Sequence, residues 1–268
     1  MSRLSAMQAV VEKDLTAVRR SRAVMLPMLI VPALLLIVLP FGVGMAARAQ
    51  DALNVEGVLR SLPANVARPI LERPQHEQLI VLVNGYLLAP LFLIVPLMVS
   101  AVLAADGFAG EKERRTLEGL LHLPIPDRDL FLAKLAAPFI PAVLLSWIGF
   151  ACFTVVANAV AWPVMHRVFL PTRLWLVMIF WVAPAVAALG LGVMVRVSAR
   201  ARTSQEANQL GGAVILPLIF LAVGQATGLL LVDLPIAVGV GAVVWAAAGF
   251  LIAQGVRRFT RERLAARL

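Results

Sequence analysis

The sequence has very little of what most enzyme sites and secreted folds require. Its one cysteine, Cys152, lies in an apolar run and excludes an internal disulfide. Its three histidines are far apart in the chain, so a shared histidine metal site is not expected. No G-x-x-x-x-G-K-[ST] motif occurs, so the chain lacks the loop with which P-loop proteins hold nucleotide phosphates.

Charged residues are also absent from the interiors of six long apolar runs, although the chain has a formal net charge of +9. Hydrophobic residues make up 61% of the sequence and the mean hydropathy is +0.90, whereas a soluble domain is about 45–50% apolar. A helix that crosses the hydrocarbon core of a bilayer takes roughly 20 residues, and each run is long enough. The runs are 23–47, 79–105, 135–165, 174–195, 207–232 and 234–256.

We therefore predict an all-α polytopic membrane protein with six transmembrane helices within residues 23–256. An amphipathic helix over 1–22 is expected on the cytosolic membrane surface, and 257–268 form a basic cytosolic tail. The largest outer loop is 48–78. Prolines predict uneven first and second helices, and we expect the third to bend near its start and to end before Pro163.

The distribution of Lys and Arg predicts the orientation. If the N-terminus is cytosolic, eighteen of the 24 basic residues fall in inner segments and six in outer ones. The positive-inside rule therefore places both termini in the cytosol of a cell (inner or plasma) membrane. Ala47-Arg48-Ala49 resembles a signal-peptidase site, but the preceding apolar run is far longer than the roughly 7–15 residues of a cleavable signal. The arginines do not interleave with aromatics, so no nucleic-acid partner is expected.

The apolar runs contain a few uncharged polar residues. Without acidic or basic residues in their interiors, these spans do not favour a self-powered, ion-coupled carrier. The polar side chains serve either interhelical hydrogen bonds or substrate contact. They include Asn84, Ser146, Asn158, Gln225 and Thr227.

Glycine pairs within the runs indicate close helix packing. Gly224 and Gly228 form a small-xxx-small pair that favours tight contact within the bundle or with a second copy. The pairs at 190 and 192 and at 239 and 241 fit close packing better than a dinucleotide site.

The segment 106–134, between the second and third runs, is strongly charged and rich in leucine. Leu117, Leu120 and Leu121 share one helical face, and Pro124 ends this helix. Burial of each leucine would contribute about 1.5–3 kcal/mol, so the face is expected to be covered. The cover is either the protein's own bundle or a groove on a partner.

Residues 109–134 resemble the signature of ABC-2 type transporter permeases, a G-E-[KR]-[ED]-x-G-T-[LIM]-[ED]-x-L-L-x-x-P pattern followed by a basic residue at the start of a membrane helix. Arg115 stands where many members have glycine, which should stiffen the helix. Residues 12–15, Pro32 and 201–218 are more loosely similar, and the sodium-efflux branch looks closest. The matching residues are Gly110, Glu111, Lys112, Glu113, Thr116, Leu117, Glu118, Leu120, Leu121, Pro124 and Lys134.

The resemblance implies the membrane-spanning subunit of an ATP-driven exporter. Such permeases work as homodimers or related heterodimers with a separate ABC ATPase subunit, which binds ATP and Mg, so no cofactor is expected on this chain. The segment 106–134 would then hold a coupling helix seated on the ATPase. The leucines named above would form its apolar contact, with Glu111, Glu113, Arg114 and Glu118 as a polar rim and Gly110, Thr116 and Pro124 as further coupling residues.

Other classes remain open at this point. The main alternative is a membrane-resident scaffold or assembly subunit without a transport path, and a self-powered carrier comes third. Asp106, Asp127 and Asp129 faintly resemble the carboxylate clusters of membrane phosphoalcohol transferases, but their spacing differs. The uncharged spans are compatible with a lipid, a drug-like amphiphile, a peptide or sodium as substrate.

Overall fold

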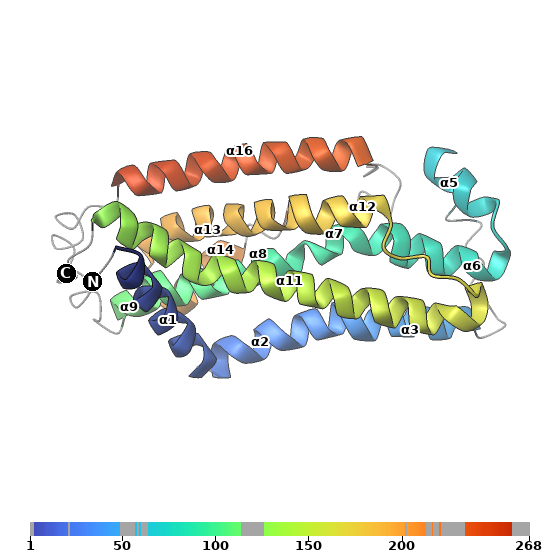
Figure 1. The fold of residues 1–268 in the computed structure, drawn as a ribbon, viewed down its shortest axis with the longest axis horizontal. Coiled ribbons are helices and arrows are strands. Elements are labelled where there is room, and N and C mark those ends of the chain that lie inside the picture. Colours follow the sequence, from blue (N-terminus) through green and yellow to red (C-terminus); the bar gives the residue numbers. More distant parts are fainter. Residues whose placement is uncertain are drawn as a thin grey trace.

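A computed structural model describes residues 3–20, 22–48, 57, 59, 64–113, 126–201, 203–212, 216, 220 and 234–258. The described part of the chain is helical and contains no β-strand. Its long helices run side by side in an elongated bundle (Figure 1). In the labels used here, η marks π-helical segments. The elements are α1 (Arg3–Arg20), α2 (Arg22–Ala33), η1 (Leu34–Val38), α3 (Leu39–Arg48), α5 (Ala64–Leu71), α6 (Gln75–Ile80), η2 (Val81–Leu87), α7 (Leu88–Phe92), α8 (Ile94–Ala105), η3 (Asp106–Gly110), α9 (Glu111–Glu113), α11 (Asp127–Met165), α12 (Arg173–Val177), η4 (Met178–Val182), α13 (Ala183–Arg200), α14 (Ser204–Gly211) and α16 (Leu234–Arg258).

Within the described residues, five helical stretches are long and apolar enough to cross a membrane. They are Met28–Arg48, Gln75–Gly110, Asp127–Met165, Arg173–Arg200 and Leu234–Arg257. They match five of the six predicted spans, and an all-helical membrane protein is thereby confirmed. The predicted span 207–232 lies mostly outside the described residues, as do Gly224, Gln225, Thr227 and Gly228.

The third span differs from its prediction at its end. Helix α11 continues through Pro163 to Met165, so the expected end before Pro163 was wrong. Only two helical residues follow this proline, and its missing N–H therefore removes a hydrogen bond in the last turn, where little helix depends on it. His166 ends the helix instead, with a left-handed φ of 49° and its N–H donated to the Trp162 carbonyl at 2.9 Å.

The first, second and fourth spans each contain a π-helical segment, which confirms the predicted irregularity of the first two. Proline lacks an N–H, and its ring displaces the carbonyl four residues earlier, which a wider turn accommodates. In η1, η2 and η4 one residue lies four positions before a proline, whereas η3, at the end of the second span, has no such proline. These pairs are Leu36 and Pro40, Tyr86 and Pro90, and Phe180 and Pro184.

Tryptophans of neighbouring helices bind carbonyls of these segments. The indole N–H of Trp175 donates to the Asn84 carbonyl in η2 at 3.0 Å. Within η4, the Ile179 carbonyl accepts from Trp147 at 3.3 Å, and the Trp181 carbonyl accepts from Trp245 at 3.2 Å. Backbone groups at membrane depth need protein partners, and these indoles supply them where the helical pattern is interrupted.

Glycines bring the fourth span close to its neighbours. A Cβ on Gly190 would lie 2.7 Å from Leu97 and 2.8 Å from the Ser100 hydroxyl, and one on Gly192 would lie 2.7 Å from Leu251. Gly241 is in close contact with Trp181 in the same way, so these three glycines confirm the predicted packing role. Gly239 does not, because a Cβ there would meet nothing within 4 Å.

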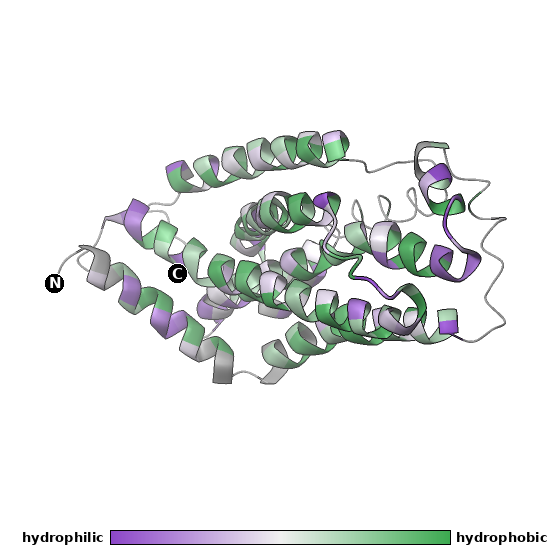
Figure 2. Cartoon of the chain, turned by 45° about the vertical axis from the view of Figure 1, so that its right-hand side comes forward, coloured by the Kyte–Doolittle hydropathy of each residue, from purple (hydrophilic) through white to green (hydrophobic). Residues whose placement is uncertain are grey.

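Hydrophobic and hydrophilic residues lie in different parts of the molecule along its length. In Figure 2 the long helices are mostly hydrophobic, and hydrophilic residues gather on α1 and at the opposite end, near α6. We call these the α1 end, which also holds α9 and α14, and the α5 end, which holds α5 and α6 (Figure 1). Buried charged and polar side chains occur at both ends, and Glu77 and Lys134 are examples.

Candidate functional site

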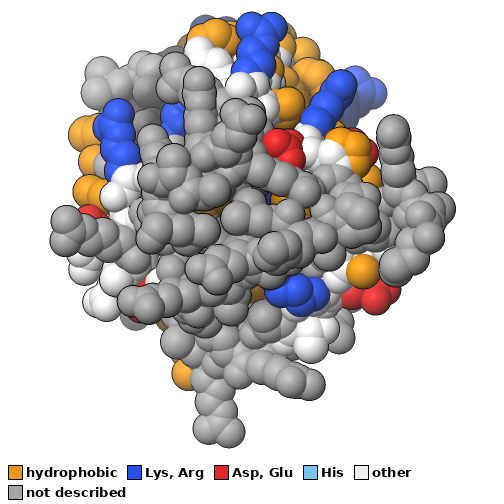
Figure 3. Space-filling model, turned by 90° about the vertical axis from the view of Figure 1, so that its left-hand side faces the viewer, with side chains coloured by type: hydrophobic (Ala, Val, Ile, Leu, Met, Phe, Trp, Pro, Cys, Tyr) orange, Lys and Arg blue, Asp and Glu red, His pale blue; other side chains and the backbone are white. Residues whose placement is uncertain are grey.

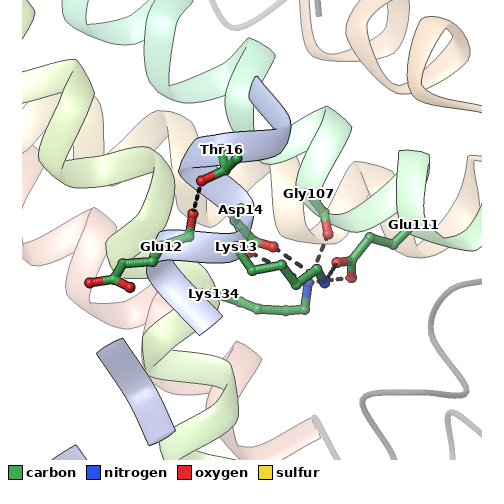
Figure 4. Close-up of polar contacts among 7 residues, drawn as sticks. All are labelled: Glu12, Lys13, Asp14, Thr16, Gly107, Glu111 and Lys134. Atoms are coloured by element: carbon green, nitrogen blue, oxygen red, sulfur yellow. Dashed lines mark hydrogen bonds and ion pairs between the residues drawn. The ribbon is translucent and has the colours of Figure 1, made fainter. Parts of the chain in front are cut away.

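Four charged side chains from three distant parts of the sequence meet at the α1 end. Lys13 and Asp14 come from α1, Glu111 opens α9 at the end of the second span, and Lys134 lies in the second turn of α11. Figure 4 shows the four side chains converging, together with the carbonyl of Gly107 in η3. We call these four residues the ion cluster.

Glu111 is the centre of the ion cluster. One of its carboxylate oxygens accepts a hydrogen bond from Lys13 Nζ at 2.7 Å, and the other is in direct contact with Lys134 Nζ. Lys134 also donates to the Gly107 carbonyl at 3.0 Å and lies 5.6 Å from the centre of the Phe108 ring. The second and third spans are therefore joined directly by a charge-assisted hydrogen bond.

Asp14 completes the ion cluster from the side of α1. Its carboxylate lies 3.5 Å from Lys13 Nζ and 3.8 Å from Lys134 Nζ. Two ammonium groups thus face two carboxylates, and the formal charges cancel. Helix α1 packs against α11, and the ion cluster adds a polar connection between α1 and both spans.

Burial makes these interactions strong. The side chains of Lys134 and Glu111 are 2% and 5% exposed, and that of Asp14 is 12% exposed. Charges removed from water at this depth are tolerated only when they are paired, because desolvation costs several kcal/mol per ion. Lys13 is 51% exposed and lies at the margin of the ion cluster.

The pKa values of the two α1 residues reflect this arrangement. Burial alone would lower the pKa of the Lys13 ammonium, but the hydrogen bond and charge of Glu111, helped by Asp14, outweigh it and raise this pKa. Burial raises the pKa of the Asp14 carboxyl, the nearby charge of Glu111 adds to the rise, and Lys134 and Lys13 oppose it. The folded state therefore favours the protonated form of Asp14 more than the unfolded chain does.

An apolar layer supports the ion cluster. Ala109 and Phe131 belong to a buried group that also contains Ala201 and Ala207, which flank the start of α14. The Phe108 and Phe131 rings lie 6.3 Å apart. The segments around residues 12, 110 and 201 were singled out separately in the sequence, and the structure brings all three together at this end.

Of the predicted coupling residues, the structure describes Gly110, Glu111 and Glu113. Gly110 is buried, Glu113 is exposed, and Glu111 is turned into the ion cluster and away from an exposed rim. Figure 3 looks onto the α1 end, where basic and acidic side chains are visible between hydrophobic ones. The other coupling residues lie outside the described part of the chain, namely Arg114, Thr116, Leu117, Glu118, Leu120, Leu121 and Pro124.

Three of the predicted polar candidates in the spans lie within the described residues, and they behave differently. Ser146 donates to the carbonyl of Ala142, four residues earlier in its own helix, at 2.7 Å. Asn158 is fully bonded: its NH₂ donates to the Thr154 and Leu170 carbonyls, and its oxygen accepts from the backbone N–H groups of Phe169 and Leu170. These contacts favour helix and loop packing for both residues.

Asn84 stands apart from the other two. It is 1% exposed, and neither its side-chain oxygen nor its NH₂ has a partner among the described residues. Sequence reasoning found Asn84 as a candidate but could not separate it from Ser146 and Asn158. Sequence reasoning also missed the pairing of Lys134 with Glu111. A signal for it was available, because residues of opposite charge lie at the facing ends of two successive apolar runs.

The described helices that are long and apolar enough to cross a membrane indicate a helical membrane protein. Residues 8–258 match the family described as ABC-2 family transporter protein, and the chain belongs to this family. The family is a membrane component that is not itself catalytic and generally works with an ABC ATPase subunit. No curated protein matches the chain.

Proposed function

We propose that this chain is the membrane-spanning permease subunit of an ATP-driven ABC exporter, moved by a separate ATPase that contacts the segment 106–134. The observation that carries the proposal is the pairing of Glu111 with Lys134. Glu111 closes the second span and Lys134 opens the third, so one buried ion pair holds together the two ends of this segment.

This arrangement suits a mechanical role. A force applied to residues between Glu111 and Lys134 reaches both spans through the same pair, because neither end can move without separating buried charges. Lys13 and Asp14 extend the connection to α1. The second and third spans and α1 would therefore move as one unit when a bound ATPase closes on ATP and Mg.

The leucine face provides the contact in this proposal. Leu117, Leu120 and Leu121 would fill a groove on the ATPase, with Glu113, Arg114 and Glu118 at its edge. Burial of three leucines supplies several kcal/mol of association free energy, about 1.5–3 kcal/mol for each side chain. A charge in the middle of that face would remove most of it.

Leu120→Asp tests this contact. Purified from native membranes, the unaltered chain is expected to bring down a P-loop ATPase whose activity rises in the complex. The variant is expected to lose both the ATPase and the stimulation while it still inserts in the membrane. Leu71→Asp is the matched control, because Leu71 is 40% exposed at the α5 end and should leave the complex intact.

Unchanged ATPase capture and stimulation in Leu120→Asp would contradict the coupling contact. If no P-loop subunit accompanies the unaltered chain, the alternative of a membrane scaffold without a transport path is favoured. Transport that survives ATP depletion but stops when an ion gradient is removed would favour a self-powered carrier.

The finer features follow from the same proposal. The permease would act as a dimer with a second copy or a related chain, in the cell membrane, with six spans and both termini in the cytosol, and α1 would lie along the inner surface. Resemblance to the sodium-efflux branch makes Na⁺ the first substrate to test. Cysteine labelling of Cys152→Ala chains that carry one new cysteine at residue 5 or 72 would establish the orientation, with residue 72 reached from outside only.

A further inference from the structure

Helices α13 and α16 pack side by side, and both reach the α1 end (Figure 1). Near that end, the guanidinium of Arg196 in α13 donates a hydrogen bond to the side-chain oxygen of Gln254 in α16. The close approach of Gly192 to Leu251 lies about one turn earlier on both helices, so the two helices run parallel towards the α1 end. Their last turns are therefore neighbours.

An exposed arginine follows on each helix, about one turn beyond this hydrogen bond. Arg200 ends α13 four residues after Arg196, and Arg257 follows Gln254 by three residues on α16. Residues three or four apart lie on the same face of a helix. The two exposed arginines therefore lie on the helix faces that carry the contact between Arg196 and Gln254. We call Arg196, Arg200, Gln254 and Arg257 the arginine site.

The three arginines of this site have no carboxylate partner among the described residues. The ion pairs there involve other basic residues, and Arg196, which is partly buried, bonds to a neutral amide. The tendency of basic residues to collect at one membrane surface accounts for Arg200 and Arg257, where two of the spans end. It does not account for Arg196, which lies one turn inside its span, because a charge at that depth is costly without a partner of opposite sign.

Apolar side chains lead along both helices to the arginine site. On α13, the partly buried Val193 precedes Arg196 by three residues. On α16, Val243 and Phe250 are largely exposed, and they precede Gln254 by eleven and four residues. Helical spacing places each set on the face that carries the polar residues. Because both helices are long and apolar enough to cross a membrane, these faces are suited to contact with lipid chains.

We propose that the arginine site binds the phosphate of an anionic phospholipid, whose acyl chains lie along these faces of α13 and α16. A planar guanidinium can hold a phosphate through two parallel hydrogen bonds. Basic sites between membrane helices bind anionic head groups in this way. The arginines favour an anionic over a zwitterionic head group, and the adjoining apolar faces favour a lipid over free phosphate. Gln254 acts as a positioning residue that holds Arg196.

Native mass spectrometry of the purified permease in detergent tests the site. The protein is titrated with dioleoyl phosphatidylglycerol and, separately, with dioleoyl phosphatidylcholine. Phosphatidylglycerol is expected to bind more tightly, and a large excess of inorganic phosphate should not displace it. In a second measurement, phosphatidylglycerol with a diazirine on its acyl chain is photolysed on the protein. Its adducts are expected on the stretch of α16 that contains Val243 and Phe250. Neither measurement requires a variant.

Two substitutions test the charges. Arg200→Ala and Arg257→Ala should each weaken the binding of phosphatidylglycerol by about 5-fold, the contribution of one basic residue near an anionic head group. Binding of phosphatidylcholine should change less. Arg173→Ala is the matched control, because Arg173 is exposed at the opposite end of the span that holds Arg200 and should leave the binding unchanged. The unfolding temperature of each variant is measured first.

A neutral substitution separates a built site from general attraction between charges. Gln254→Leu leaves the net charge unchanged but removes the acceptor that holds Arg196. It should therefore weaken the binding of phosphatidylglycerol. Gln75→Leu is its control, since Gln75 is exposed at the α5 end and should have no effect. Unchanged binding in a folded Gln254→Leu chain would contradict the positioning role.

The proposal is overturned if phosphatidylcholine binds as tightly as phosphatidylglycerol, if inorganic phosphate displaces the lipid, or if the adducts spread evenly over the spans. It is also overturned if Arg200→Ala and Arg257→Ala lose an ATPase but keep the lipid, because the arginines would then serve a protein partner. Lipid binding is measured on the permease alone. This site can therefore fail while the coupling to an ATPase holds, and it can hold if the coupling fails.

Discussion

The two ends of the bundle both join distant segments through a buried carboxylate, but they do so with different partners. At the α1 end, Glu111 meets Lys134, whose ammonium is itself buried. At the α5 end, Glu77 meets Arg73 and Arg167, whose side chains are 36% and 50% exposed. The α1 end therefore encloses both charges, whereas the α5 end encloses only the anion.

The difference determines what each end can tolerate. An exposed guanidinium can turn to water when its partner is lost, and Glu77 has a second arginine at 3.6 Å. Lys134 has Asp14 as a second carboxylate at 3.8 Å, but its buried ammonium cannot turn to water. The α1 end is thus expected to tolerate the loss of its main ion pair less well, which is consistent with its place at the junction of the helices that we propose to move together.

Lys134→Met is expected to have the largest effect. It leaves Glu111 buried with only Lys13 as its cationic partner, and breaking a buried pair costs about 3–5 kcal/mol. Thermal unfolding in detergent, followed by circular dichroism, measures the loss. Arg128→Met is the matched control, since Arg128 is exposed on the same helix and should unfold near the temperature of the unaltered chain.

A second change separates pairing from packing. Glu111→Met combined with Lys134→Met removes both charges, and replacing a buried pair by apolar side chains is often neutral. We expect the double variant to regain most of the lost stability but to lose stimulation of the ATPase. Equal instability of the single and double variants would show that the pairing is not the cause.

Asn158→Leu tests the neutral connection at the α5 end. The change leaves the N–H groups of Phe169 and Leu170 and the Leu170 carbonyl without their side-chain partner. The expected loss is about 1–3 kcal/mol, the cost of leaving buried polar groups unpaired. Asn158→Asp keeps the acceptor and should lose less, and the ranking of the two unfolding temperatures is the measurement.

Arg167→Met should lower the stability less than Lys134→Met or Asn158→Leu. Its partner Glu77 retains Arg73, and partly exposed ion pairs contribute at most about 1 kcal/mol. If Arg167→Met lost as much stability as Lys134→Met, the two ends would not differ in how well they tolerate the loss of an ion-pair partner. The same unfolding measurement, repeated at low and high salt, is expected to show screening for Arg167→Met and little for Lys134→Met.

Asp14→Asn should have the smallest effect and the opposite sign. The folded state raises the pKa of Asp14, so it favours the protonated carboxyl more than the unfolded chain does. The ionised carboxyl therefore lowers the free energy of unfolding at pH values above the folded pKa. The variant should therefore be as stable as the unaltered chain at pH 7, or more so. Its relative advantage should shrink as the pH falls towards 3.8, which unfolding temperatures across pH 3.5–7 can check.

Much of the fold was predictable because membrane insertion depends on composition. Long runs without charge specify helices that span a bilayer, since hydrocarbon offers no partner to an open backbone. The prolines at 40, 90 and 184 also carry a local signal, because each lies four residues after a π-helical residue. Pro163 shows the limit of such reasoning, because the effect of a proline depends on how much helix remains beyond it.

The candidate site was predictable in part. The motif identified Glu111 and Lys134 one by one, but placed Glu111 on a rim that faces a partner, and the structure turns it towards Lys13 and Lys134. A pattern with helical spacing shows which side chains share a face but not which neighbour covers that face. Asn84 is the other case. The sequence pattern around a polar residue in an apolar run is the same whether or not its side chain is hydrogen-bonded.

By itself, the sequence determined that this protein is a helical membrane protein of the ABC-2 transporter family, because hydrophobic runs and a local motif depend only on residues near one another. Only the tertiary structure decided that α1, the second span and the third span share one ion cluster, and that the Asn84 amide has no partner among the described residues. Both depend on which helices lie side by side, and the free energy of a buried charge or amide is set by the neighbours that reach it across the fold.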